Sequence, residues 1–157
     1  MHHDDECSLA VMLALFTGLR LGEICALQWE DISFETNSLY VNKTVQRLNT
    51  TNRSGDARTK LLVSHPKSAA SNRLIPLPAF LIKYLGQFPH ETEHAYVLNN
   101  EIYTPMEPRT LQYHYQKMLQ KIGVPYLNFH CLRHPYVKHT TKNIILKSRK
   151  PKLPRWI

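Results

Sequence analysis

Residues 129–134 read Phe-His-Cys-Leu-Arg-His, and three of these six side chains can carry positive charge. If the stretch is helical, His130, Arg133 and His134 stand at i, i+3 and i+4 and share one face. Leu132 then points the other way, into a core. Arginine offers a planar two-pronged donor suited to phosphate or carboxylate, and histidine adds a donor whose charge switches near neutral pH. The stretch predicts an anion site or, more plainly, a helix start with solvated basic side chains.

A second arginine suited to such a site lies far upstream, directly after an apolar helix. Acids at 4–6 precede apolar residues at 9–16, which predicts a centrally buried helix that breaks at Thr17-Gly18. Arg20 and Glu23 then fall on the first turn of a second helix, three positions apart. Because Arg20 is held against the core there, its charge needs a partner. Glu23 is the plain structural partner.

Between these two motifs the hydrophobic spacing changes to the period of a β-strand. Residues 39–45 alternate between apolar and polar side chains, and 61–63 and 74–77 are two short apolar runs. We expect these three segments to form a small antiparallel sheet. The turn at 65–73 would then present Lys67 at the tip of a hairpin.

The remaining segments are predicted from turn residues and helical spacing. Pro76 indicates that the last strand lies at a sheet edge, and the polar, basic residues 46–60 predict a mobile loop. Apolar residues at helical spacing predict helices over 80–88 and 111–122. Residues 89–107 are expected to be mostly loop.

The net charge of +8 is distributed unevenly along the chain. Residues 1–42 hold one arginine and seven acids, whereas 43–73 hold seven Lys/Arg and one Asp, and 138–157 hold seven Lys/Arg and no acid. The middle segment and the tail therefore predict a polyanion partner, with a solvated basic loop as the plainer alternative. The candidate DNA contacts of the middle segment are Lys43, Arg47 and Arg73.

Cysteine usage and hydropathy limit the cellular setting. Cys7, Cys25 and Cys131 are odd in number and lack paired spacing, which predicts reduced thiols in a cytosolic compartment. The longest apolar run, 9–16, is far too short for a membrane span, and the acids before it do not suit a signal peptide. One domain is the natural expectation for 157 residues.

Three motifs follow one another along the chain: Thr17-Gly18-Leu19-Arg20-Leu21-Gly22-Glu23, then Pro66-Lys67-Ser68 with Arg73-Leu74-Ile75-Pro76-Leu77-Pro78, and last His130-Cys131-Leu132-Arg133-His134. Together they resemble the tyrosine recombinases, also called the phage integrase family, over about residues 5–137. The resemblance implies an α+β, mainly helical fold, the integrase-type catalytic domain with a small three-stranded antiparallel sheet. We therefore expect a partial catalytic domain over 1–137.

The resemblance also implies a role for each motif residue. Arg20 and Arg133 match the two arginines that grip the non-bridging oxygens of the scissile DNA phosphate. His130 matches a histidine that donates to this phosphate and assists proton transfer, and Lys67 matches the hairpin lysine that protonates the leaving 5′ oxygen. Glu23 resembles the acid that supports the arginine site.

The implied chemistry needs no cofactor and no metal. Two guanidinium forks and an imidazole can stabilise the charge that builds on a five-coordinate phosphorus. His134 resembles a family position with a largely structural task. A zinc site from His130, Cys131, His134 and His139 is set aside because their spacing does not match the usual zinc motifs.

The chain departs from the family after the last motif. Pro135 stands where a threonine or serine is usual, which predicts a kinked or delayed helix. We recognise no nucleophile, because Tyr136, the last tyrosine, is too close to Arg133. Residues 138–157 are expected to form a divergent, poorly ordered basic tail. We therefore expect a truncated product that binds DNA weakly and cleaves it only if another protomer supplies a tyrosine.

The resemblance implies double-stranded DNA as the partner and a role in recombination or integration of a mobile genetic element such as a phage. It also implies a prokaryotic, nucleoid-associated protein in the cytoplasm, with no membrane contact and, if complete, a homo-oligomer on DNA. Two alternatives stay open at this point. One is a non-catalytic DNA-binding module, and the other is the related type IB topoisomerase, which uses a similar constellation.

Overall fold

The computed structural model describes residues 3–51, 57–65, 72–88, 92–101 and 103–133. Its helices are α1 (His3–Thr17), α2 (Leu21–Ala26), α3 (Ala79–Leu85) and α4 (Pro108–Lys121), with 3₁₀ turns η1 (Trp29–Asp31) and η3 (Phe129–Leu132). The strands are β1 (Ile32–Ser33), β2 (Ser38–Val41), β3 (Thr44–Thr51), β4 (Ala57–Ser64), β5 (Arg73–Pro76), β6 (Asn99–Glu101) and β7 (Thr104–Pro105). These helices and small antiparallel sheets agree with the predicted α+β class.

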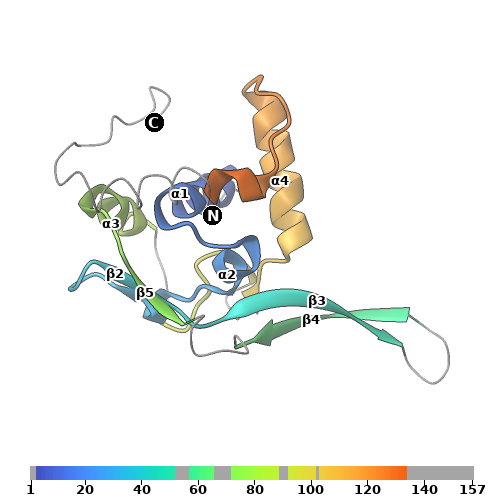
Figure 1. Ribbon diagram of the computed structural model, residues 1–157, viewed down its shortest axis with the longest axis horizontal. Helices are drawn as coiled ribbons and strands as arrows, with labels where there is room; N and C mark the ends of the chain where they lie inside the picture. The colour runs from blue at the N-terminus through green and yellow to red at the C-terminus, as the bar shows by residue number, and fades with distance from the viewer. Residues whose placement is uncertain (1–2, 52–56, 66–71, 89–91, 102, 134–157) are drawn as a thin grey trace.

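Helix α1 forms the centre of the core, as its apolar sequence predicts. Leu9 and Leu13 on α1 are completely buried, and the intervening Ala10 is buried with them. Figure 1 shows α1 in the middle of the molecule, between α3 and α4 and above α2. A helix that is apolar all round is stable only when other elements cover every side, and this arrangement provides that cover.

The small three-stranded sheet has the antiparallel order β1-β2-β5. Pro76 lies in β5 at the sheet edge, as predicted, where the missing N–H of proline leaves no ladder bond broken. The composition of the sheet differs from the prediction, because residues 61–63 are not part of it. The short strand β1 takes the third place.

The predicted loop at 46–60 is wrong, and so is the predicted hairpin of 61–63 with 74–77. Strands β3 and β4 pair over eight residues each, from Thr44 opposite Ser64 to Thr51 opposite Ala57. Figure 1 shows this ribbon as a long hairpin that extends away from the helices. Because the outer ribbon has little core to cover, it lacks the apolar alternation on which strand prediction relies. Its pairing is instead favoured by the proximity of the two strands in sequence.

The two later helices are confirmed. Helix α4 begins with Pro108 at its first turn and buries Leu111, Tyr115 and Leu119. Gly123 ends it with a positive φ of 70°, a conformation that glycine adopts without strain. No helix in the described part of the chain has the length and apolar character needed to cross a membrane.

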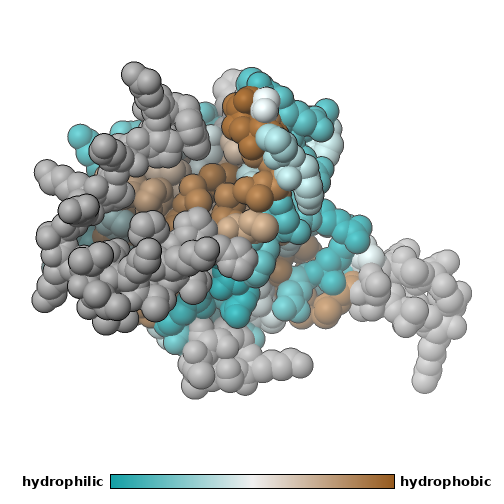
Figure 2. All heavy atoms as spheres, turned by 45° about the horizontal axis from the view of Figure 1, so that its top comes forward, coloured by the Kyte–Doolittle hydropathy of each residue, from teal (hydrophilic) through white to brown (hydrophobic). Residues whose placement is uncertain are grey.

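Part of the apolar surface stays exposed. Figure 2 shows apolar side chains gathered toward the centre and the top of one face, with hydrophilic side chains beside them. The segment that follows α4 contributes to the exposed apolar surface of the molecule, with Ile122, Val124, Tyr126 and Leu127 each more than two-fifths exposed.

Candidate functional site: a cluster of three arginines and one glutamate

The turn between α1 and α2 positions Arg20. The hydroxyl of Thr17 donates to the carbonyl of Leu13 at 2.5 Å, and Gly18 has a φ of 66°, so the chain leaves α1 abruptly. Leu19 is then buried, and Arg20 is the N-cap residue of α2 in an extended conformation. The side chain of Arg20 is 62% exposed. The turn therefore anchors the backbone in the core and leaves the guanidinium largely in solvent.

Gly22 allows α2 to lie directly on β3. A Cβ atom at this position would be 2.6 Å from the carbonyl oxygen of Val45 and 2.7 Å from the hydroxyl of Thr44. Because the first of these contacts is with backbone, a side chain here would force α2 and β3 apart. The close approach fixes the first turn of α2 against the base of the β3–β4 hairpin.

The carboxylate of Glu23 lies at the centre of the cluster and is only 7% exposed. Its Oε2 accepts from the backbone N–H of Arg20 at 2.7 Å, and its Oε1 accepts from the Arg20 guanidinium at 3.1 Å. Arg73 in β5 adds a two-pronged contact, at 3.0 Å to Oε1 and 2.8 Å to Oε2. Glu23 thus accepts four hydrogen bonds, which matches the acceptor capacity of an ionised carboxylate.

The electrostatics keep Glu23 ionised. Burial raises the pKa of Glu23, but the hydrogen bonds from Arg73 and from the Arg20 backbone, together with both guanidinium charges, outweigh it and lower the pKa below its usual range.

Arg133 joins the cluster from the other end of the described chain. Its Nε donates to the carbonyl of Gly18 at 2.7 Å, across 115 positions of sequence. Burial lowers the pKa of Arg133, the charges of Arg20 and Arg73 lower it further, and Glu23 opposes them. An arginine stays protonated at neutral pH despite such a shift. Three guanidinium groups and one carboxylate therefore share this site, with an excess of positive charge.

Phe129–Leu132 form a 3₁₀ turn, η3, and Arg133, the last described residue of the motif, is α-helical, whereas an α-helix through the whole motif was one expectation. Phe129 and Leu132 are buried, as predicted for Leu132, and the side chain of Asn128 accepts the backbone N–H of His130 at 2.9 Å. In a 3₁₀ turn, residues i and i+3 are eclipsed, so His130 and Arg133 still lie on one side. His130 is exposed.

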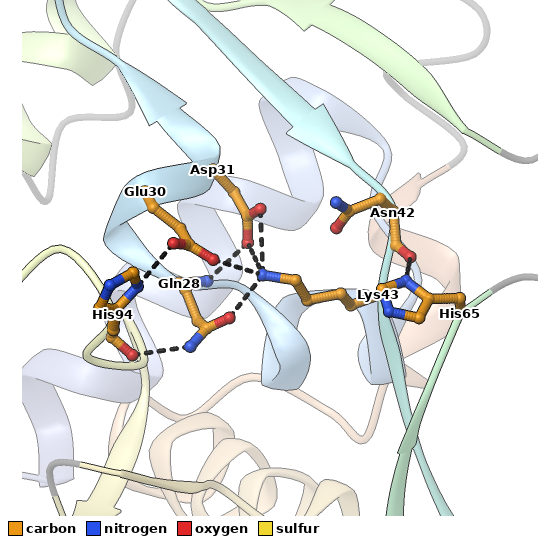
Figure 3. A network of polar contacts seen from close by, with 7 residues as sticks. All are labelled: Gln28, Glu30, Asp31, Asn42, Lys43, His65 and His94. Atoms are coloured by element: carbon orange, nitrogen blue, oxygen red, sulfur yellow. Dashed lines mark hydrogen bonds and ion pairs between the residues drawn. The ribbon is translucent and has the colours of Figure 1, made fainter.

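Lys67 and His134 lie outside the described residues, as do Pro135, Tyr136 and the basic tail. The structure does place His65, two positions before Lys67. Its Nδ1–H donates to the carbonyl of Asn42 at 2.9 Å (Figure 3), which ties the end of β4 to the segment before β3.

Lys43 takes part in a separate polar network (Figure 3). Its ammonium group contacts Glu30 at 2.9 Å, Asp31 at 3.3 Å and the side-chain oxygen of Gln28 at 2.5 Å, and its side chain is 14% exposed. Burial lowers the pKa of Lys43, but the two acids outweigh this and raise it. His94 completes the network by contacting Glu30 at 2.7 Å. The ammonium group is engaged within the fold, and a contact of Lys43 with DNA stays a prediction.

The two other candidate DNA contacts also have partners within the fold. Arg47 in β3 forms an ion pair with Glu107 at 2.7 Å, next to the first turn of α4. Arg73 holds Glu23, as described above. The sequence singled out Arg73 as a basic residue of the middle segment and as the first residue of the 73–78 part of the second motif, without naming a partner for it. Its contact with Glu23 depends on strand β5 passing beside α2, which no local pattern signals.

The sequence of the chain matches a known protein family. The model of the family described as "Phage integrase family" matches residues 3–144. The chain belongs to the phage integrase family. The resemblance that the three motifs indicated is thereby confirmed.

Two curated relatives in the phage integrase family are recombinases. A XerC-like tyrosine recombinase of Caldanaerobacter subterraneus subsp. tengcongensis is 31% identical over 140 residues, which cover 80% of this chain and 36% of the relative. The tyrosine recombinase XerA of Thermococcus onnurineus is 26% identical over 140 residues, which cover 86% of this chain and 41% of the relative. The chain thus spans about two-fifths of the length of either relative.

Solved structures support the same fold. The integrase of the transposon Tn1549, solved in complex with a circular intermediate DNA, superposes with a TM-score of 0.66 at 18% identity. The match covers 86% of this chain and 46% of that integrase. At this level of identity the similarity establishes the integrase-type fold.

Proposed function

We propose that this chain provides the phosphate-binding part of the catalytic centre of a site-specific DNA recombinase. In such a recombinase, a tyrosine oxygen would bond to the scissile phosphorus while the bond to the 5′ oxygen breaks, and a 5′ hydroxyl would later attack the 3′-phosphotyrosine and release the tyrosine. One observation carries the proposal: Arg20 and Arg133, remote in sequence, both border the turn between α1 and α2.

The charges of the cluster suit a phosphodiester in its transition state. Attack on phosphorus moves negative charge onto the non-bridging oxygens, and preorganised guanidinium donors stabilise that charge without reorganising. The exposed guanidinium of Arg20 and the NH groups of Arg133 that do not bind Gly18 are the proposed donors. His130, on the same side of η3 as Arg133, is the proposed third donor.

The remaining roles rest on the family membership. Lys67 is the proposed acid that protonates the leaving 5′ oxygen, Glu23 positions Arg20, and His134 has a structural task. The proposed substrate is double-stranded DNA of a mobile genetic element, and the proposed assembly is a homo-oligomer on that DNA. The proposed location is the nucleoid of a prokaryotic cell.

The phosphate site can be tested by DNA affinity. Binding of a fluorescein-labelled duplex of mixed sequence is followed by fluorescence anisotropy at fixed salt for Arg20→Ala, Arg133→Ala and the control Lys83→Ala. Lys83 is an exposed residue of α3, so the control removes one charge outside the cluster. We expect the arginine variants to bind about tenfold more weakly than the control, because each loses a charge-assisted contact. Equal losses in all three variants would instead favour a non-catalytic module that holds DNA by surface charge.

The nucleophile is tested separately. A library of nicked duplexes with randomised sequence is incubated with the 157-residue chain and resolved on a denaturing gel. We expect no covalent protein–DNA product from this chain alone. A covalent product that disappears in Tyr136→Phe would show that the last tyrosine is the nucleophile and would overturn this expectation.

A further inference from the structure

The proposed function gives no role to the contact between Arg73 and Glu23. The guanidinium of Arg73 lies beside Arg20 and Arg133, and it makes a two-pronged contact with the carboxylate of Glu23. Arg73 is 32% exposed, about half as much as Arg20. A direct role in DNA binding would leave this two-pronged contact unexplained.

The contact matters because Glu23 is also the partner of Arg20. A carboxylate and a guanidinium form a parallel pair of hydrogen bonds when both are free to do so. Here the guanidinium of Arg20 makes one bond, to Oε1 at 3.1 Å, because the backbone N–H of Arg20 and the two donors of Arg73 occupy the other acceptor positions. Arg73 and Arg20 therefore compete for the same carboxylate.

We infer that Arg73 is a positioning residue that occupies Glu23 and so keeps Arg20 available for a DNA phosphate. Without Arg73, two acceptor positions on Glu23 become free. Arg20 then closes into a two-pronged pair with Glu23, and its charge is neutralised where the phosphate should bind. With Arg73 in place, Glu23 is saturated, and the exposed part of the Arg20 guanidinium points its unused donors at solvent. This inference rests on the proposed function and assigns a residue to the same site.

Lysine at position 73 separates charge from geometry. Arg73→Lys keeps the positive charge but replaces a planar fork with a single ammonium group, which cannot fill both sides of the carboxylate in the same way. We expect Arg73→Lys to weaken binding of the fluorescein-labelled duplex on the order of tenfold, the loss of about one charge-assisted contact.

The decisive variant restores the site by removing the competitor. Glu23→Gln in the Arg73→Lys background abolishes the carboxylate that captures Arg20, so duplex affinity should return to within about threefold of the Glu23→Gln single variant. A role of Arg73 in direct phosphate contact, or in simple packing, predicts no such rescue. The four proteins of the cycle are the natural chain, the two single variants and the double variant.

The outcomes separate this inference from the proposed function. Rescue in the double variant, together with a loss in Arg73→Lys, supports the positioning role. If Arg73→Lys binds like the natural chain, or if Glu23→Gln fails to rescue it, the positioning role is overturned even when Arg20→Ala weakens binding as expected. If Arg20→Ala binds like Lys83→Ala, the proposed function itself fails. Should Arg73→Lys unfold at the assay temperature, Arg73→Gln takes its place in the same cycle, with the same rescue expected.

Discussion

Replacing Glu23 by alanine removes the acceptor of four hydrogen bonds and leaves the guanidinium groups of Arg20 and Arg73 without their shared carboxylate. Breaking a buried ion pair on one side typically costs about 3–5 kcal/mol. The exposure of Arg20 and Arg73, 62% and 32%, lets water replace part of what is lost. We therefore expect Glu23→Ala to lower the free energy of unfolding by about 2–4 kcal/mol.

Urea unfolding followed by circular dichroism measures this loss directly. Glu35→Ala is the matched control, because Glu35 is exposed, and we expect it to change the free energy of unfolding by less than about 0.5 kcal/mol. A loss for Glu23→Ala no larger than that of the control would show that the fold is equally stable when the two arginines lack the carboxylate, contrary to this prediction.

Three further predictions concern stability. The pKa of Glu23 is lower in the folded state than its ordinary value, so ionised Glu23 stabilises the fold above the ordinary glutamate pKa. This stabilisation is lost as the pH falls through the folded-state pKa. The difference in unfolding free energy between the natural chain and Glu23→Gln should therefore shrink on acid titration. Gly22→Ala should cost about 1–3 kcal/mol in urea unfolding, because its Cβ would meet the Val45 carbonyl at 2.6 Å, and a cost near zero would show that α2 can move freely. Lys43→Met should destabilise the fold by about 1–3 kcal/mol by leaving the buried Asp31 uncompensated, and adding Asp31→Asn should recover part of that loss in the same measurement.

The core helix and the motifs at 17–23 and 129–134 were predictable because the sequence patterns that indicate them are local. An apolar run bounded by acids and by Thr17-Gly18 needs no long-range information to indicate a buried helix. The pairing of Arg20 with Glu23 likewise follows from helical spacing, and the structure places these two side chains at 3.1 Å. The motif at 129–134 indicated an anion site but not which backbone carbonyl would hold Arg133.

The missed features carry no local hydrophobic pattern that would signal them. The outer part of the β3–β4 hairpin pairs mostly polar residues that have little core to face, so no hydrophobic alternation marks it. Arg73 meets Glu23 only because β5 lies beside β2 and near α2, 50 positions away from Glu23 in sequence. The acids that contact Lys43 come from the preceding acidic segment, so these ion pairs were not predictable from its place in a basic segment. Counting charge along a sequence does not reveal which charges are already paired.

The proposed function requires that Arg20 and Arg133 bind one phosphate together. To test this, the natural chain is titrated with inorganic phosphate, and nitrogen-15 NMR monitors the Nε–H groups of its arginines. We expect the signals of Arg20 and Arg133 to shift with one common dissociation constant, while the signal of Arg109, an exposed arginine on α4, stays in place. Two different dissociation constants, or a shift at only one of the two arginines, would contradict the claim.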